Sequence, residues 1–82
     1  MAKDQLREAV IVQVVRLLRE ERERQRLSMN ALAERSGLSQ SMISLVERDL
    51  RNPTLDTLLR MADVLEVDLG TLIKRAKKMA AK

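Results

Sequence analysis

The segment from Gln40 to Arg48 carries polar side chains at positions that share one face of a helix. Ile43 and Val46 occupy the opposite face, which suits a core. The outward positions follow one another at i, i+1, i+4, i+5 and i+8 and are Gln40, Ser41, Ser44, Leu45 and Arg48. Their amide, hydroxyl and guanidinium groups donate and accept hydrogen bonds. The chemistry expected of this face is therefore recognition of a polar partner.

The composition argues against catalysis. The 82 residues contain no Cys and no His, so the chain lacks a thiol nucleophile, a zinc ribbon and the usual acid/base group of neutral pH. Carboxylates are plentiful, but they lie among arginines on amphipathic segments, and no Gly-rich phosphate loop or metal-ligand spacing occurs. We therefore expect no enzyme, no metal site and no cofactor.

The length fits a single domain spanning residues 1–82. No apolar run exceeds the four residues Ala9–Val12, which excludes a membrane span or a signal-peptide core and predicts a cytoplasmic protein without membrane contact. With no aromatic residue, the core must consist of Leu, Ile, Val, Met and Ala, which favours packed helices. A domain of this size buries only about 60–65% of its extendable surface, so dimerisation would help it.

Residues that start or stop helices divide the chain into five expected helices. These are about 4–26, a short helix between Ser28 and Gly37, one from Ser39 to about Glu47, one over 55–65 that Thr54 caps, and one opened by Asp68 that frays from Met79 onward. The helix over 55–65 is expected to bury the side carrying Leu55, Leu58, Leu59, Ala62 and Leu65.

Two short helices separated by a tight turn lie between Met29 and Val46, which is the helix-turn-helix layout. Ala33 is small where the two helices must approach closely. Gly37 can adopt the left-handed turn without the cost of about 1–2 kcal/mol that a Cβ imposes. This joint spacing predicts a helix-turn-helix motif at about 28–48.

The stretch from Leu27 to Pro53, LSMNALAERSGLSQSMISLVERDLRNP, resembles the Cro/C1-type (Xre) family of bacterial and phage repressors. The likeness continues through TLDTLLRMADVLEVDLGTLI and covers roughly residues 14–73. It implies an all-α fold, a five-helix lambda-repressor-like DNA-binding domain, here with an extended N-terminal helix. It also implies binding to double-stranded DNA as a homodimer, with the third helix in the major groove.

By this similarity the expected base contacts are Gln40, Ser41, Ser44 and Leu45. Every base pair shows a distinct pattern in the major groove, and Gln pairs well with the N6 and N7 edge of adenine. Leu45 is unusual on an outward face; a thymine methyl group or a protein partner could cover it.

Contacts to the DNA backbone are expected from Asn30, Ser39, Arg48, Arg51 and Asn52. The segment 28–53 holds three Arg and three acidic residues and is therefore neutral. The five basic residues of the tail 74–82 exceed the net charge of +4. This tail either tracks phosphates or serves solubility.

The resemblance also implies an ion pair between Arg22 and Glu47, although two unrelated surface charges would fit the sequence as well. Two features depart from the family. Met29 stands where relatives place a Gln that braces the reading helix, and Asp49 and Glu66 stand where relatives often have Gly in a left-handed turn.

The N-terminal row Leu6, Val10, Val14 and Leu17 is the candidate dimer interface. Its rival is packing of this row on the chain's own fourth and fifth helices.

The function predicted from these features is a sequence-specific transcriptional regulator, a repressor that occupies a pseudo-palindromic operator. A protein-interaction module, such as an antitoxin or a coactivator that uses Leu45 and the Leu6–Leu17 row, is the alternative. The sequence does not choose between a restriction–modification controller and an antitoxin.

Overall fold

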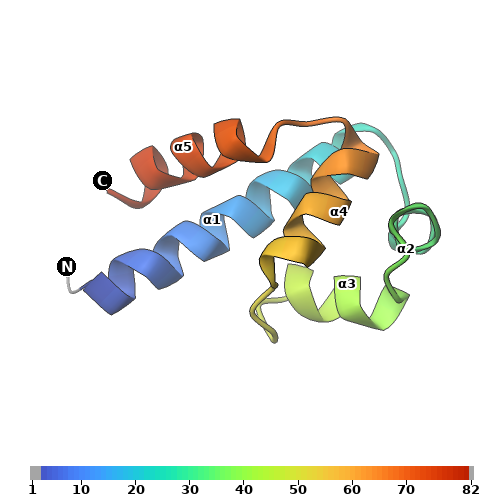
Figure 1. Ribbon diagram of the computed structural model, residues 1–82, viewed down its shortest axis with the longest axis horizontal. Helices are drawn as coiled ribbons and strands as arrows, with labels where there is room; N and C mark the ends of the chain where they lie inside the picture. Colours follow the sequence, from blue (N-terminus) through green and yellow to red (C-terminus); the bar gives the residue numbers. More distant parts are fainter. Residues whose placement is uncertain (1–2, 82) are drawn as a thin grey trace.

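The computed structural model describes residues 3–81, which form five α-helices and no strand. The helices are α1 Lys3–Arg24, α2 Met29–Ser36, α3 Gln40–Glu47, α4 Leu55–Leu65 and α5 Leu69–Ala80. Figure 1 shows α5 lying along α1 on one side, while α3 lies on the other side, and both chain ends are at the end of the molecule away from α2. The predicted all-α, five-helix fold with a long first helix is confirmed. No helix among these residues is long and apolar enough to cross a membrane.

Four helices begin at the capping residue that the sequence predicted. Ser28, Ser39, Thr54 and Asp68 each have extended backbone angles, and the side-chain oxygen of each accepts a hydrogen bond from the backbone N–H three residues later. These bonds satisfy N–H groups that the first helical turn leaves without a partner. At α5 the hydrogen bonds from Thr71 also lower the pKa of the Asp68 carboxyl below its ordinary value.

Left-handed residues end three of the helical segments. Gly37 follows α2 with φ of 76° and donates its N–H to the Ala33 carbonyl. Asp49 and Glu66 adopt positive φ angles of 57° and 58°, as their places in the sequence predicted. Arg26, in the connection between α1 and α2, is a fourth left-handed residue with φ of 56°, and the sequence analysis did not predict it because no glycine or asparagine stands there.

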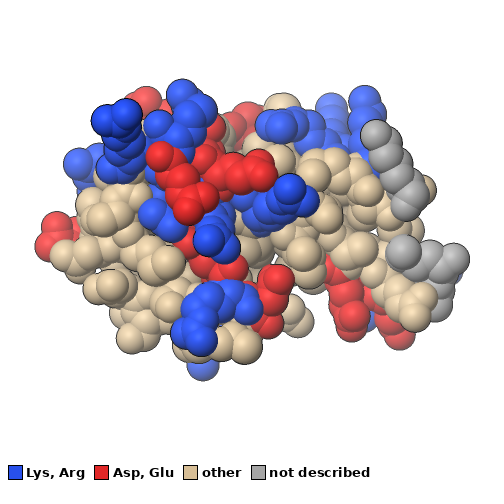
Figure 2. All heavy atoms as spheres, turned by 180° about the vertical axis from the view of Figure 1, so that it is seen from behind, with Lys and Arg blue, Asp and Glu red and all other residues tan. Residues whose placement is uncertain are grey.

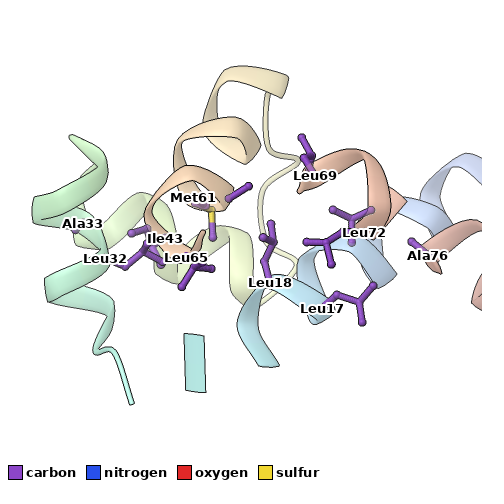
Figure 3. Packing of buried hydrophobic residues seen from close by; sticks show 12 residues of the cluster. Leu17, Leu18, Leu32, Ala33, Ile43, Met61, Leu65, Leu69, Leu72 and Ala76 are labelled. Atoms are coloured by element: carbon purple, nitrogen blue, oxygen red, sulfur yellow. The ribbon is translucent and has the colours of Figure 1, made fainter. Parts of the chain in front are cut away.

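A core without aromatic residues joins all five helices (Figure 3). The largest fully buried side chains come from the first four helices and are Leu18, Leu32, Ile43, Val46, Met61 and Leu65. Leu69, Leu72 and Ala76 extend this core beneath α5. Because α2 and α3 each contribute side chains to it, α2 is held against α4 and α3 against the long α1.

The row on α1 that was the candidate dimer interface lies largely inside this core. Val14 and Leu17 are 3% and 5% exposed, and Val10 is half-buried against the core. Leu6 is 41% exposed. The dimer assignment is therefore wrong for Val14 and Leu17, and the rival packing within the chain is correct, because α5 covers α1 along this row.

The basic segment after residue 73 is helix and not a loose tail. α5 runs to Ala80, so the prediction of fraying from Met79 is wrong; residue 82 lies outside the described residues. Ala76 and Ala80 are 0% and 8% exposed, and their small side chains let α5 approach α1 closely. The basic residues Lys74, Arg75, Lys77 and Lys78 remain exposed on the outer side of α5.

The buried side of α4 also differs from the prediction. Leu55 and Leu59 are 64% and 44% exposed, whereas Thr57 and Met61 are buried together with Ala62 and Leu65. Both sets of residues follow a helical period. The structure buries the set of residues centred on Met61, because that side of α4 faces α1 and α2.

We predict that Gly37→Ala lowers the free energy of unfolding by about 1–2 kcal/mol, because a Cβ is strained at this φ. The new Cβ would also lie 3.1 Å from Nη1 of Arg60. Gly37→Asn should cost less, since Asn tolerates the left-handed region better than Ala does. Urea unfolding followed by circular dichroism measures both variants. Equal stability of the Ala variant and the parent would contradict this account of the turn.

Candidate nucleic-acid interface

The outer side of α3 presents its polar side chains together, and residues 3–81 leave most of them exposed. Gln40, Ser41 and Arg48 are exposed, and Ser44 and Leu45 are half-buried. These five residues, which we call the reading face, line a shallow hollow of about 500 Å³. Ile43 and Val46 on the opposite side are fully buried. As its sequence predicted, α3 therefore has an apolar inner side and a polar outer side.

A buried ion pair fixes the end of α3. Arg22 donates through Nε to Oε2 of Glu47 at 2.7 Å and through Nη2 to Oε1 at 2.8 Å. Its third nitrogen, Nη1, donates to the Leu27 carbonyl at 2.8 Å. The side chains are only 10% and 1% exposed, and the hydrogen bonds to Glu47 raise the pKa of Arg22. Arg22 thus joins α1, the α1–α2 connection and α3 at one point.

The turn between α2 and α3 is held from both sides. Within it, Ser36 Oγ donates to the Ala33 carbonyl at 3.2 Å and accepts from the N–H of Leu38 at 3.3 Å. From α4, Nη1 of Arg60 donates to the Ser36 carbonyl at 3.1 Å. These contacts leave little freedom in the angle between α2 and α3.

The five candidate residues for DNA backbone contacts are all exposed: Asn30, Ser39, Arg48, Arg51 and Asn52. Asn30 lies in the first turn of α2 and Ser39 caps α3, while the other three follow the end of α3. Nη1 of Arg51 lies 3.7 Å from Sδ of Met42, so this side chain reaches back toward α3. The candidates therefore flank both ends of the reading helix.

Three positioning residues escaped the sequence analysis. Arg60 is 24 residues from the carbonyl it binds, and Gln25 donates to the Leu65 carbonyl, 40 residues away, at 2.8 Å. Met29, noted as a departure, is half-buried and packs against the core, so it acts as an apolar anchor for α2. No local pattern signals contacts between residues this far apart in the chain.

Charged side chains are distributed unevenly over the molecule. In Figure 2 acidic and basic groups interleave over much of the surface, and basic groups gather at the edge where α5 ends. On α1 the interleaving includes Arg16–Glu20 at 3.2 Å and Arg19–Glu23 at 3.7 Å. Because α5 lies on the far side of α1 from α3, its basic residues are remote from the reading face. Among residues 3–81, no cluster of acidic side chains could hold a metal ion.

We predict that Glu47→Ala lowers the free energy of unfolding by about 3–5 kcal/mol, because it leaves the Arg22 charge buried without its partner. Glu20→Ala, which breaks the exposed pair with Arg16, should cost at most about 1 kcal/mol. Urea titrations compare the two.

If Glu47→Ala proves unfolded, the double variant Arg22→Met, Glu47→Leu provides the second measurement. It should regain most of the lost stability, because apolar replacements remove both buried charges. Similar losses for Glu47→Ala and Glu20→Ala would contradict the importance of the buried pair.

Known proteins are similar to this chain over the region that contains α2 and α3. Residues 18–72 match a family described as helix-turn-helix. An uncharacterized HTH-type transcriptional regulator of Mycobacterium tuberculosis, found in two strains, is 46% identical over 59 residues, which is 72% of this chain and 42% of that protein. Another from Sinorhizobium fredii is 39% identical over 56 residues, 68% of this chain and 29% of its own length. The chain thus spans less than half of the length of these relatives, and no solved structure matches it significantly. The matched residues run from the second half of α1 into α5, and the chain belongs to the Cro/C1-type helix-turn-helix family.

Proposed function

We propose that the chain is a sequence-specific DNA-binding transcriptional regulator that places α3 in the major groove. The observation that carries this proposal is the reading face, which residues 3–81 leave open to solvent along a shallow hollow. An α-helix fits the major groove, where amide and hydroxyl groups can distinguish bases. The HTH-type transcriptional regulators among the relatives support the same function.

Each residue of the reading face suits a particular contact. Gln40 and Ser41 lie in the first turn of α3, the part of a reading helix that comes closest to base edges. Gln40 is proposed to pair with adenine, and Ser41 and Ser44 to donate or accept hydrogen bonds with neighbouring bases. Leu45 lines the hollow, where a thymine methyl group would cover its half-buried side chain.

The flanking residues would fix the helix on the duplex. Ser39 caps one end of α3, Arg48, Arg51 and Asn52 follow the other, and Asn30 lies in the first turn of α2, so we propose that they contact phosphates on both sides of the groove. Because residues 28–53 are neutral overall and the basic residues of α5 lie elsewhere, few counterions would be released on binding. The expected salt dependence is modest.

A homodimer would give this small reading helix enough specificity. α3 has eight residues, about 12 Å of helix, and spans only a few base pairs. Two copies related by a two-fold axis would read half-sites about 34 Å apart in a pseudo-palindromic operator. Repression is the proposed outcome, since occupying an operator requires no surface beyond those that contact DNA.

Exposed leucines beside α3 offer a dimer contact in place of the α1 row. Leu50 follows α3 and is 61% exposed, and Leu55 and Leu59 lie one turn apart on α4 at 64% and 44%. Large apolar side chains this exposed gain most by covering one another. A two-fold contact here would keep the two reading helices near the same duplex.

We predict that Gln40→Ala costs about 1–3 kcal/mol of binding at one preferred base step and leaves nonspecific binding unchanged. Arg51→Ala should weaken binding to all sequences alike, because it removes a backbone contact. The preferred sequence comes first from selection among random duplexes, and fluorescence anisotropy then measures each variant. Absence of any enriched sequence would refute the proposed function, and a uniform loss for Gln40→Ala would move this residue to the backbone contacts.

We predict that the double variant Leu55→Gln, Leu59→Gln sediments as a monomer at concentrations where the parent is dimeric. Val12→Gln, on α1 at 40% exposure, is the matched control and should remain dimeric. Operator binding by the double variant should fall about tenfold or more, since one half-site contact is lost. A parent that stays monomeric with and without operator would exclude the dimer.

A further inference from the structure

A second surface hollow lies at the end of the molecule where both chain ends are found. It is a groove of about 540 Å³ between the first turns of α1 and the last turn of α5. Its floor is formed by Leu6, Val10 and Ile11, and its rim by Lys3, Arg7 and Lys77. These residues, which we call the apolar groove, all lie outside residues 18–72, the part that matches the helix-turn-helix family.

The floor of the apolar groove is incompletely covered by residues 3–81. Leu6 is 41% exposed, and Val10 and Ile11 are half-buried. The three follow the helical order i, i+4 and i+5 on α1, with α5 alongside. A channel between two helices with apolar residues at this spacing fits the apolar stripe of a third helix.

The rim is basic, and acidic side chains among residues 3–81 neutralise only part of its positive charge. Arg7 is paired with Asp4 at 3.1 Å, whereas Lys3 and Lys77 form no ion pair within residues 3–81. Lys74 and Lys78 add two exposed cations on the same helix as Lys77. Figure 2 shows this concentration of basic groups at the edge where α5 ends, beside an uncharged band. A complementary occupant would carry carboxylates beside its apolar stripe.

Two other occupants match this surface poorly. DNA would meet the cations but gain nothing from the apolar floor, and α3 lies on the other side of α1. A second copy seated on the same groove would bring two sets of Lys3, Arg7 and Lys77 together, and like charges in close contact are costly.

We propose that the apolar groove binds an acidic amphipathic helix of another protein. The apolar stripe of that helix packs on Leu6, Val10 and Ile11, and its carboxylates pair with Lys3 and Lys77. This interaction goes beyond the proposed DNA binding and uses a surface separate from the reading face.

The test uses the full chain and a display library of random helical peptides of about 16 residues, a length of about 24 Å. Enriched peptides should carry apolar residues at helical spacing flanked by Glu or Asp. For the best peptide, Leu6→Gln should weaken binding at least about tenfold, as truncation at the centre of an interface does. Val12→Gln is the matched control, since it lies on the same helix at nearly the same exposure, 40% against 41%, and should change binding less than about twofold.

A charge reversal provides the second measurement. Lys77→Glu should weaken peptide binding more than Lys74→Glu, which makes the same change on α5 outside the apolar groove. Library selection without acidic enrichment, equal effects of Leu6→Gln and Val12→Gln, or equal effects of the two reversals would overturn the proposal. So would conversion of a dimeric parent to a monomer by Leu6→Gln, which would assign the groove to a second copy. DNA affinity should be unchanged in all four variants, so failure here is distinct from failure of the DNA-binding proposal.

Discussion

The contact between Arg22 and Glu47 determines how α3 is held. A helix of eight residues has little stability of its own, because the cost of forming its first turn is spread over few hydrogen bonds. Its orientation must come from tertiary contacts. Ile43 and Val46 bind one side of α3 to the core, and Glu47 joins its last turn to α1 and, through Arg22, to the Leu27 carbonyl. The outer side can then stay polar and uncovered without losing its position.

The long α1 connects two ends of the molecule that differ in net charge. Its C-terminal half supports α3 and α4 through buried residues such as Leu18. Its N-terminal half is paired with α5, which carries the excess positive charge of the chain. The neutral helix-turn-helix end and the basic α5 end are therefore separate surfaces, and a substitution at one need not disturb the other.

Local signals in the sequence were sufficient to predict where the helices begin. Side-chain oxygens at Ser28, Ser39, Thr54 and Asp68 act within three residues, so their effect can be recognised from the sequence alone. The same holds for the outward positions of α3, which follow from helical spacing around Ile43 and Val46. The placement of these side chains is observed, and their contacts with DNA are part of the proposal.

Predictions that depended on what covers a face were less reliable. The spacing of Val14 and Leu17 indicates that something buries them, but it does not distinguish a second copy from α5. Ala76 and Ala80 gave no strong signal, because alanine is common both in cores and on surfaces. On α4 two overlapping rows competed, and only the position of the neighbouring helices selects Met61 over Leu55 and Leu59.

The pairing of α1 with α5 also brings the two ends of the fold together, away from α2 and α3. Polypeptide joined before α1 or after α5 would leave the domain there, beside the apolar groove. The architecture can therefore be embedded in a longer protein, or linked in tandem, without an appended module having to cross the outer side of α3.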